Sequence, residues 1–271
     1  MKNFINAPVL NEFTDLLENM YRLGWDERNA GNVSLILDED DYCEYIDTNR
    51  ILGTFPLDIN AKDLAGRYFL ITGSGKYFRN ARKNQSTDLG VIRINPDGQS
   101  LSLLWGLEGG SRPTSELNTH LLSHSARLQV DPYHRVLIHT HATNLIAMSF
   151  VHELSDKAFT KTLWKRNTEC LVVFPDGIGV LPWMVCGNAE IGHLTAEKFS
   201  SCRLVIWAMH GILGTGRDLD EAFGLIETAE KAAAIHMQIK NLGIKQEISD
   251  EELDRLAQAF NVTPRRGYLQ K

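Results

Sequence analysis

This chain is organised around the stretch Val136-Leu137-Ile138-His139-Thr140-His141. Its three apolar residues predict a short buried strand, which ends where residues 142–144 begin a loop. Side chains at positions i and i+2 of a strand point to the same face, so we expect both imidazoles to leave the sheet together. Two neutral imidazoles that converge suit a divalent cation such as zinc. The competing interpretation is that one ring packs in the core and the other caps a loop.

A third histidine favours the metal site over the competing interpretation. His210 follows the apolar run Leu204-Val205-Ile206-Trp207, which predicts a second buried strand. Histidines at the ends of two strands form a set of three that leaves coordination positions open, as a catalytic metal site requires. We therefore expect His139, His141 and His210 to bind a divalent metal ion.

The composition is that of an ordinary soluble protein. The chain has 271 residues, of which 43% are hydrophobic and 23% are charged, so it can form one large domain or two small ones. Its net charge of −6 argues against nucleic-acid binding through bulk charge. The four cysteines show no C-x-x-C spacing, and we find neither a secretory signal nor an apolar run long enough to span a membrane. We expect a cytoplasmic protein with reduced thiols.

Two turns are candidate anion sites. The loop from Trp25 to Asn32 leads into a predicted strand at 33–37, and Asn29, Gly31 and Asn32 could line an anion pocket, although an ordinary turn has the same composition. The second turn, residues 72–76, follows a predicted strand at 68–71. It lacks the full P-loop pattern, but its backbone N–H groups and the Ser74 hydroxyl could still contact a phosphate.

A helix that starts near Pro113 offers a third anion site. Thr114 and Ser115 are suitable N-terminal caps, and the free N–H groups of a first turn bind anions. Glu116 in that turn has a purely structural explanation, because a carboxylate complements the helix dipole. His120 and His124 lie one turn apart and could bind a metal together, but we expect them to be exposed or hydrogen-bonded in the core.

The remaining pattern predicts one domain. The acidic stretch from Asp38 to Glu44 predicts a solvated loop or the end of a hairpin. Glu169 stands at the start of an apolar run that predicts a strand. We expect helices over residues 8–23, 145–151, 155–166, 188–201, 219–241 and 249–260, and further strands over 91–94, 101–105, 169–174 and 178–181. No repeat or linker divides the chain. The fold class is therefore α/β, a single domain over residues 1–271 with a mostly antiparallel central sheet flanked by helices on its faces, and with a less ordered tail after Pro264.

Several of these motifs occur together in one known family. The segments 30–34, 115–116, 139–141 and 210–211 resemble, in order and spacing, the zinc-dependent class II sugar-phosphate aldolases. That family also contains a phosphopentulose epimerase and the adducin head domain, and the resemblance covers nearly the whole chain. The longer blocks at 24–29, 72–76, 113–117 and 169–177 resemble the branch that acts on L-rhamnulose 1-phosphate.

The resemblance implies an activity and a role for each residue. The reaction would be reversible cleavage of the ketose phosphate to dihydroxyacetone phosphate and L-lactaldehyde in L-rhamnose catabolism, by a homotetramer with one Zn²⁺ per chain. The three histidines would hold zinc, which stabilises the enediolate. Glu116 would move the proton at the nucleophilic carbon, and Glu169 the proton on the aldehyde-derived oxygen across a subunit boundary. The substrate phosphate would be held by Asn29, Asn32, Ser74, Thr114 and Ser115. This chain has Ala30 where relatives have glycine.

Three alternatives are open at this point. Another aldolase of the family, or the phosphopentulose 4-epimerase, would use the same zinc site, although the block around Glu169 argues against the epimerase. A non-catalytic module like the adducin head should lack the complete histidine set and the carboxylate. A metal-free Schiff-base aldolase needs a buried lysine near the site, and Lys76 is the candidate.

Overall fold

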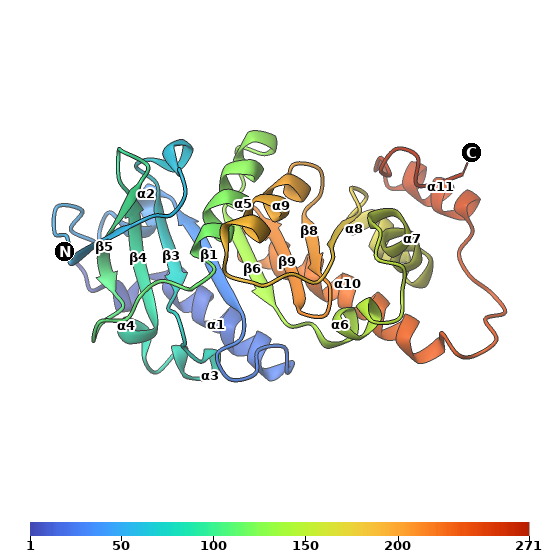
Figure 1. Ribbon diagram of the computed structural model, residues 1–271, viewed down its shortest axis with the longest axis horizontal. Helices are drawn as coiled ribbons and strands as arrows, with labels where there is room; N and C mark the ends of the chain where they lie inside the picture. The colour runs from blue at the N-terminus through green and yellow to red at the C-terminus, as the bar shows by residue number, and fades with distance from the viewer. Residues whose placement is uncertain (271) are drawn as a thin grey trace.

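A nine-stranded sheet crosses the molecule within residues 1–270, the part of the chain that the computed structural model describes (Figure 1). The strand order is β2-β5-β4-β3-β1-β6-β9-β8-β7, and every pair is antiparallel except β7 and β8. The strands are β1 (Asn32–Leu37), β2 (Gly53–Pro56), β3 (Tyr68–Thr72), β4 (Leu89–Ile94), β5 (Ser100–Gly106), β6 (Val136–Thr140), β7 (Ile178–Leu181), β8 (Leu204–Trp207) and β9 (Gly211–Gly216). The predicted α/β fold with a mostly antiparallel sheet is confirmed.

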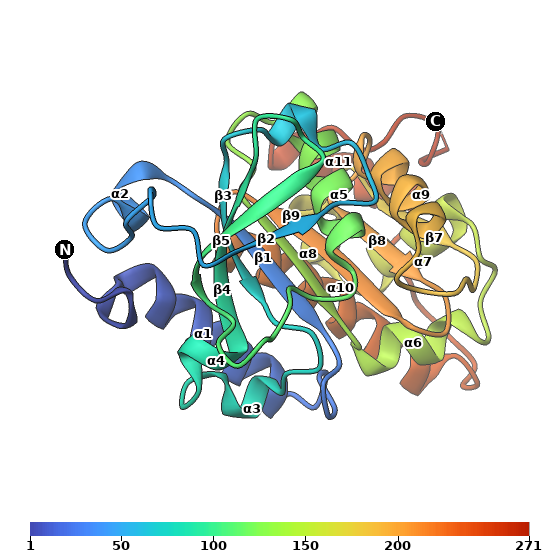
Figure 2. The same ribbon diagram turned by 60° about the vertical axis from the view of Figure 1, so that its left-hand side comes forward.

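Helices cover both faces of the sheet. They are α1 (Pro8–Arg22), α2 (Glu39–Tyr42), α3 (Phe78–Ala81), α4 (Gln85–Asp88), α5 (Leu117–Val130), α6 (Thr143–Ser149), α7 (Asp156–Arg166), α8 (Thr168–Val173), α9 (Ala189–Phe199), α10 (Leu219–Ile239) and α11 (Asp250–Ala259), with two short 3-10 turns at Phe4–Asn6 and Lys62–Leu64. In Figure 1, α5 and α9 lie in front of the sheet and α1 and α10 behind it. Figure 2 shows the molecule turned by 60°, with α6, α7 and α9 around the end of the sheet that β8 and β7 form. None of the helices in the described residues is long and apolar enough to cross a membrane.

The central strand β6 packs against both helical layers. Val136 and Ile138 belong to the core cluster that contains α1 and α10, whereas Leu137 between them packs with residues of α9. This alternation follows from the two-residue period of a strand, because successive side chains point to opposite faces. All five residues of β6 are buried between β1 and β9. Strand β6, which carries His139, therefore has a neighbouring strand at each edge and a helical layer on each face.

Two local predictions were wrong. Residues 169–174 do not form a strand, because α8 begins there: the Asn167 side chain accepts the N–H of Glu169, and Cys170 and Leu171 are buried on one side of the turn. A six-residue apolar run does not by itself distinguish a strand from a buried helix. The expected loop at 38–44 contains the short helix α2, which a capping box between Asp38 and Asp41 begins.

The hairpin β4–β5, the long helix capped by Asp218 and the capping box of Ser249 and Glu252 are confirmed. Residues 265–270 lie against the rest of the molecule. The backbone N–H of Arg265 donates to the carbonyl of Pro175, and that of Gln270 donates to Asp250. Lower order in this segment stays a prediction.

Candidate metal centre and active site

Three histidines meet at one end of the sheet. His139 lies in β6, His141 follows that strand, and His210 lies in the turn between β8 and β9. The strand pairing brings them together, since β6 pairs with β9 and Thr140 lies opposite Ile212. One ring nitrogen from each histidine lies within 4.8 Å of the others. The structure thus assembles the set that the two strand ends predict.

The close approach of the two strands depends on a glycine. A Cβ atom added at Gly211 would lie 2.5 Å from the carbonyl oxygen of Thr140 and 3.0 Å from Cε1 of His139. Before it, Met209 adopts a positive φ of 62°, which is uncommon for a residue with a side chain, and its N–H donates to the Ser149 hydroxyl at 2.7 Å. This tight turn aims His210 at the other two rings.

Hydrogen bonds orient the rings of His139 and His141 so that Nε2 of each is free to bind a cation. Nδ1 of His139 donates to the carbonyl of Ile212 at 3.2 Å, which leaves Nε2 with a free lone pair, and this atom is buried without a hydrogen-bond partner among residues 1–270. Nδ1 of His141 donates to Glu27 at 3.0 Å, which frees its Nε2 in the same way. Burial lowers the pKa of His139 well below its usual value and that of His210 to about 4. Neutral, oriented imidazoles are what a catalytic divalent cation requires.

The loop before β1 is hydrogen-bonded to Thr140 and His141, beside the three histidines. Asp26 is 1% exposed, and the Thr140 hydroxyl donates to its carboxylate at 3.1 Å. A Cβ atom at Gly31, whose φ is +75°, would lie 1.9 Å from that carboxylate. The backbone N–H of His141 also donates to the carbonyl of Trp25 at 2.9 Å. Sequence reasoning did not assign roles to Asp26 and Glu27, because their partners are more than a hundred residues away in the chain.

A cavity of about 250 Å³ opens over the three histidines. Nine of the residues predicted for the site line it: Asn29, Asn32, Ser74, Thr114, Ser115, Glu116, His139, His141 and His210. Two of the three predicted anion sites, the turn at residues 72–76 and the helix start near Pro113, are joined by backbone hydrogen bonds, from Ser74 to Arg112 at 2.8 Å and from Thr114 to Thr72 at 3.0 Å. These bonds place the turn after β3 beside the start of α5.

The start of α5 differs from the prediction by one residue. Glu116 itself is the N-cap residue, and its N–H donates to the Thr114 hydroxyl at 3.3 Å, so Thr114 and Ser115 precede the helix instead of capping it. The Glu116 side chain makes no capping hydrogen bond. It turns into the cavity, so its carboxylate is free for a chemical role.

Glu116 is a buried carboxylate beside the metal centre. It is 7% exposed, its Oε2 accepts a hydrogen bond from Nδ2 of Asn32 at 3.0 Å, and the same oxygen lies 3.8 Å from Nε2 of His139. Burial raises its pKa to about 7. A carboxylate with this pKa can accept and return a proton near neutral pH. Cys186 lies within 4.8 Å of Glu116 and His210 and was not predicted, because no spacing in the sequence connects it to them.

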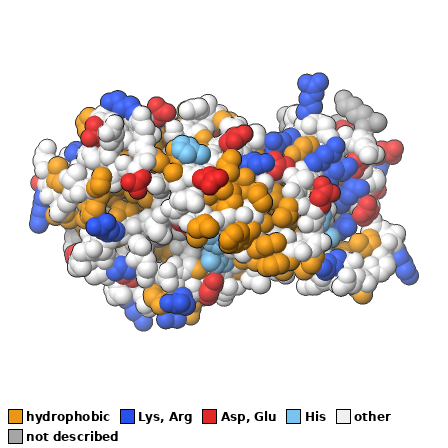
Figure 3. All heavy atoms as spheres, in the orientation of Figure 1, with side chains coloured by type: hydrophobic (Ala, Val, Ile, Leu, Met, Phe, Trp, Pro, Cys, Tyr) orange, Lys and Arg blue, Asp and Glu red, His pale blue; other side chains and the backbone are white. Residues whose placement is uncertain are grey.

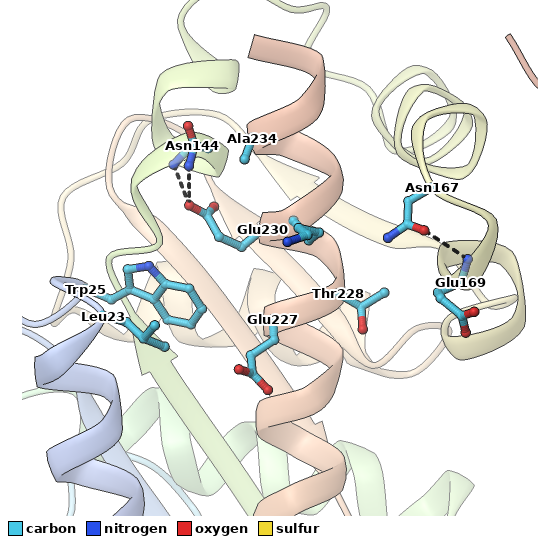
Figure 4. A pocket seen from close by; sticks show the side chains of 10 residues that line it. Leu23, Trp25, Asn144, Asn167, Glu169, Glu227, Thr228, Glu230 and Ala234 are labelled. Carbon is cyan, nitrogen blue, oxygen red and sulfur yellow. Dashed lines mark hydrogen bonds between the residues drawn. The ribbon is translucent and has the colours of Figure 1, made fainter. Parts of the chain in front are cut away.

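Glu169 does not reach this cavity. It lines a separate pocket of about 510 Å³ together with Trp25, Glu227 and Glu230, and Figure 4 shows it on α8, opposite Glu230 on α10. Within one chain the second predicted acid is therefore apart from the metal centre. Lys76 does not line the cavity either, and its ammonium lies 3.4 Å from Asp88. This arrangement does not suit a Schiff-base lysine.

The chain belongs to the class II aldolase and adducin family. The family model described as "Class II Aldolase and Adducin N-terminal domain" matches residues 11–237. Rhamnulose-1-phosphate aldolase of Enterococcus faecalis is 53% identical over 270 residues, which cover 99% of this chain and 97% of that protein. The protein of the same name from Mannheimia succiniciproducens is 47% identical over 99% of this chain and all of that protein.

Solved structures agree on the fold. A sugar-phosphate aldolase from Thermotoga maritima has a TM-score of 0.76 and is 28% identical, covering 88% of this chain and 97% of its own. An L-fuculose 1-phosphate aldolase has a TM-score of 0.61 over 93% of this chain and 96% of its own, and at 22% identity it supports the fold alone. The expected family and fold are confirmed.

Proposed function

We propose that this chain is a zinc-dependent aldolase that reversibly cleaves L-rhamnulose 1-phosphate to dihydroxyacetone phosphate and L-lactaldehyde. The observation that carries the proposal is a single cavity that joins three oriented imidazoles to a buried carboxylate with a pKa of about 7. The substrate follows from relatives named rhamnulose-1-phosphate aldolase, which are about half identical over nearly the whole chain. A non-catalytic module would not need this donor set.

The three histidines and Glu116 would have separate roles in the reaction. Zinc held by the three histidines would supply Lewis-acid stabilisation of the negative charge that develops as the carbon–carbon bond breaks. Glu116 returns a proton to the nucleophilic carbon in cleavage and removes it in condensation. Its burial disfavours the charged carboxylate, so the proton is easily taken up near neutral pH.

Neutral donors surround the place proposed for the substrate phosphate. Ser74, Thr114 and Ser115 contribute hydroxyl groups from two paired segments. Asn29 contributes an amide from the loop before β1, and Asn32 adds an amide that it shares with Glu116. A dianion in a partly dry site is well stabilised by several such donors near a helix N-terminus. The phosphate would anchor one end of the substrate and leave its carbonyl end at the metal.

We also propose a cytoplasmic homotetramer, in which Glu169 acts in the site of a neighbouring subunit on the proton of the aldehyde-derived oxygen. Two observations support an assembly of copies. Glu169 lines its own pocket and not the metal cavity of its chain. Hydrophobic side chains gather on the face shown in Figure 3, and the segment between β7 and α9 exposes Trp183 by 62% and Val185 by 63%.

One assay tests the activity. The zinc-loaded protein is incubated with L-rhamnulose 1-phosphate, and dihydroxyacetone phosphate and L-lactaldehyde are measured. Parallel incubations contain L-fuculose 1-phosphate and a phosphopentulose. Formation of both products from rhamnulose 1-phosphate is the expected result. A 4-epimer of the phosphopentulose, formed without release of a triose phosphate, would identify an epimerase instead.

A further inference from the structure

A line of buried polar side chains runs from Glu116 into the interior of the protein. We refer to these residues as the histidine chain: Asn32, Ser34, His120, His124 and His134. They come from three parts of the fold. Asn32 and Ser34 share one face of β1, His120 and His124 lie one turn apart on α5, and His134 precedes β6. None is more than 7% exposed.

Each member lies within hydrogen-bonding distance of the next. Nδ2 of Asn32 is 3.0 Å from Oε2 of Glu116, and Oδ1 of Asn32 contacts Nε2 of His120. Nδ1 of His120 is 2.6 Å from the Ser34 hydroxyl, which is 2.7 Å from Nε2 of His124. Nδ1 of His124 is 2.8 Å from Nε2 of His134. The two histidines of α5 are thus joined through a serine.

The three imidazoles of the histidine chain are neutral at physiological pH, because burial lowers their pKa values. Burial lowers the pKa of His120 and His134 to about 3, and that of His124 well below its usual value. A neutral imidazole donates from one ring nitrogen and accepts at the other, so every ring passes the direction of hydrogen bonding to its neighbour. Once the donor and the acceptor are known for the hydrogen bond at the Glu116 end, the direction of every other hydrogen bond in the histidine chain follows.

The carboxylate at the end sets that direction. Ionised Glu116 can only accept, so Asn32 must turn its NH₂ group to Glu116 and its oxygen to His120. Nε2–H of His120 then donates to Asn32, and the Ser34 hydroxyl donates to Nδ1 of His120. His124 and His134 continue the series, each donating from Nε2. Every donor points toward Glu116.

We propose that the histidine chain positions Glu116 for proton transfer, by holding Oε2 as a permanent acceptor and leaving Oε1 to carry the substrate proton. The proposal rests on the aldolase function proposed above. Oε1 forms no hydrogen bond within residues 1–270, whereas Oε2 is bound by Asn32. Because a reacting group must be held within about 0.5 Å of its productive position, a rigid supporting network affects the rate directly. The members beyond Asn32 are positioning residues that act through it.

Two variants of one residue test this role. His120→Leu removes the N–H that orients Asn32, whereas His120→Gln retains an amide donor that can reach it. We measure exchange of the dihydroxyacetone phosphate carbon-bound proton with solvent deuterium in zinc-loaded protein. His120→Leu should lower the maximal exchange rate about 10- to 100-fold with zinc content nearly unchanged, and His120→Gln should recover most of the rate. A normal rate in His120→Leu, a loss confined to KM, or equal losses in both variants overturns the proposal.

A measurement on the unaltered protein does not depend on the folding of variants. Neutron diffraction from deuterated crystals locates the protons directly. Deuterium on Nε2 of His120, His124 and His134 is expected, and deuterium on Nδ1 of any of them overturns the one-way chain. Wild-type protein that neither cleaves rhamnulose 1-phosphate nor exchanges the proton contradicts the proposed function, and the neutron result still decides the direction of the chain. Active wild type with unaffected His120 variants contradicts the positioning role alone.

Discussion

Glu116 combines features that a helix-end charge does not need. It occupies the N-cap position of α5, yet its carboxylate bonds to Asn32 and not to the backbone of its own helix. Burial disfavours its charged form, which is a cost that a purely structural carboxylate would avoid by pointing to solvent. Glu190 is a suitable comparison, because it is an exposed acidic residue in the first turn of α9.

Glu116→Gln separates the two explanations. The amide keeps the size and hydrogen bonding of the side chain but cannot accept a proton, so deuterium exchange of dihydroxyacetone phosphate should fall by about 10²–10⁴-fold. Zinc content should be unchanged, because the histidines are intact. Glu190→Gln is the matched control, and its rate should equal that of the wild type. Near-normal exchange in Glu116→Gln would return Glu116 to the role of a helix-end charge.

The proposed metal ligands His139, His141 and His210 give a second prediction for single residues. A strong chelator should abolish cleavage, and Zn²⁺ should restore it to protein that contains about one zinc per chain. His210→Ala should lower zinc content without unfolding the chain, since His210 lies in a turn and is only half-buried. The exposed His193 on α9 serves as the control substitution, measured by metal analysis and circular dichroism. Full activity of metal-free protein would contradict a metal-dependent mechanism.

Two short elements, the turn after β3 and the start of α5, supply three of the five residues of the proposed phosphate site, Ser74, Thr114 and Ser115. Their backbone pairing between Gly73 and Pro113 brings donors that are forty residues apart in sequence into one wall of the cavity. The side chains of Ser74, Thr114 and Ser115 are uncharged, so phosphate binding by them would depend on hydrogen-bond geometry and not on ion pairing.

Ser115→Ala tests this wall. Loss of one hydrogen bond to a charged group costs about 1.5–3 kcal/mol, so KM for the phosphorylated substrate should rise by roughly one to two orders of magnitude. An unphosphorylated analogue should be affected little, because it lacks the group that the hydroxyl contacts. Ser200→Ala, at an exposed position after α9, is the control. Equal losses with both substrates would mean that Ser115 only maintains the fold.

The buried histidines affect the stability of the whole molecule. The pKa of His120 and of His134 is about 3 in the folded protein, against 6.5 as the ordinary value, so the unfolded chain binds more protons between these pH values. The free energy of unfolding therefore falls as pH falls below about 6.5, by about 1.4 kcal/mol per pH unit for each such histidine. The raised pKa values of Asp26 and Glu116 act in the opposite direction, because those carboxyls bind protons more readily in the folded state.

His134→Gln isolates the histidine contribution. Removing one titrating ring should reduce the pH dependence of the unfolding free energy between about pH 6 and 4 by about 1.4 kcal/mol per pH unit, whatever its effect on stability at neutral pH. Urea unfolding at a series of pH values measures this slope, and subtracting the wild-type slope cancels the carboxyl groups. An unchanged slope would mean that His134 is not buried in its neutral form.

The sequence by itself determined the features that depend on local spacing. The two-residue period of a strand put His139 and His141 on one face, and the capping residues Asp218 and Ser249 marked the starts of two helices. The set of nine cavity residues was also found in advance, because family motifs preserve the order of residues that converge in space.

Only the tertiary structure decided what depends on partners far away in the chain. An apolar run such as 169–174 becomes helix or strand according to what it packs against, and here Asn167 caps it as α8. His120 and His124 looked like isolated residues on a helix, because their common partner, Ser34, lies 86 and 90 residues away. A buried polar group must find a hydrogen-bond partner, but only the packing of β1 against α5 determines which partner it finds.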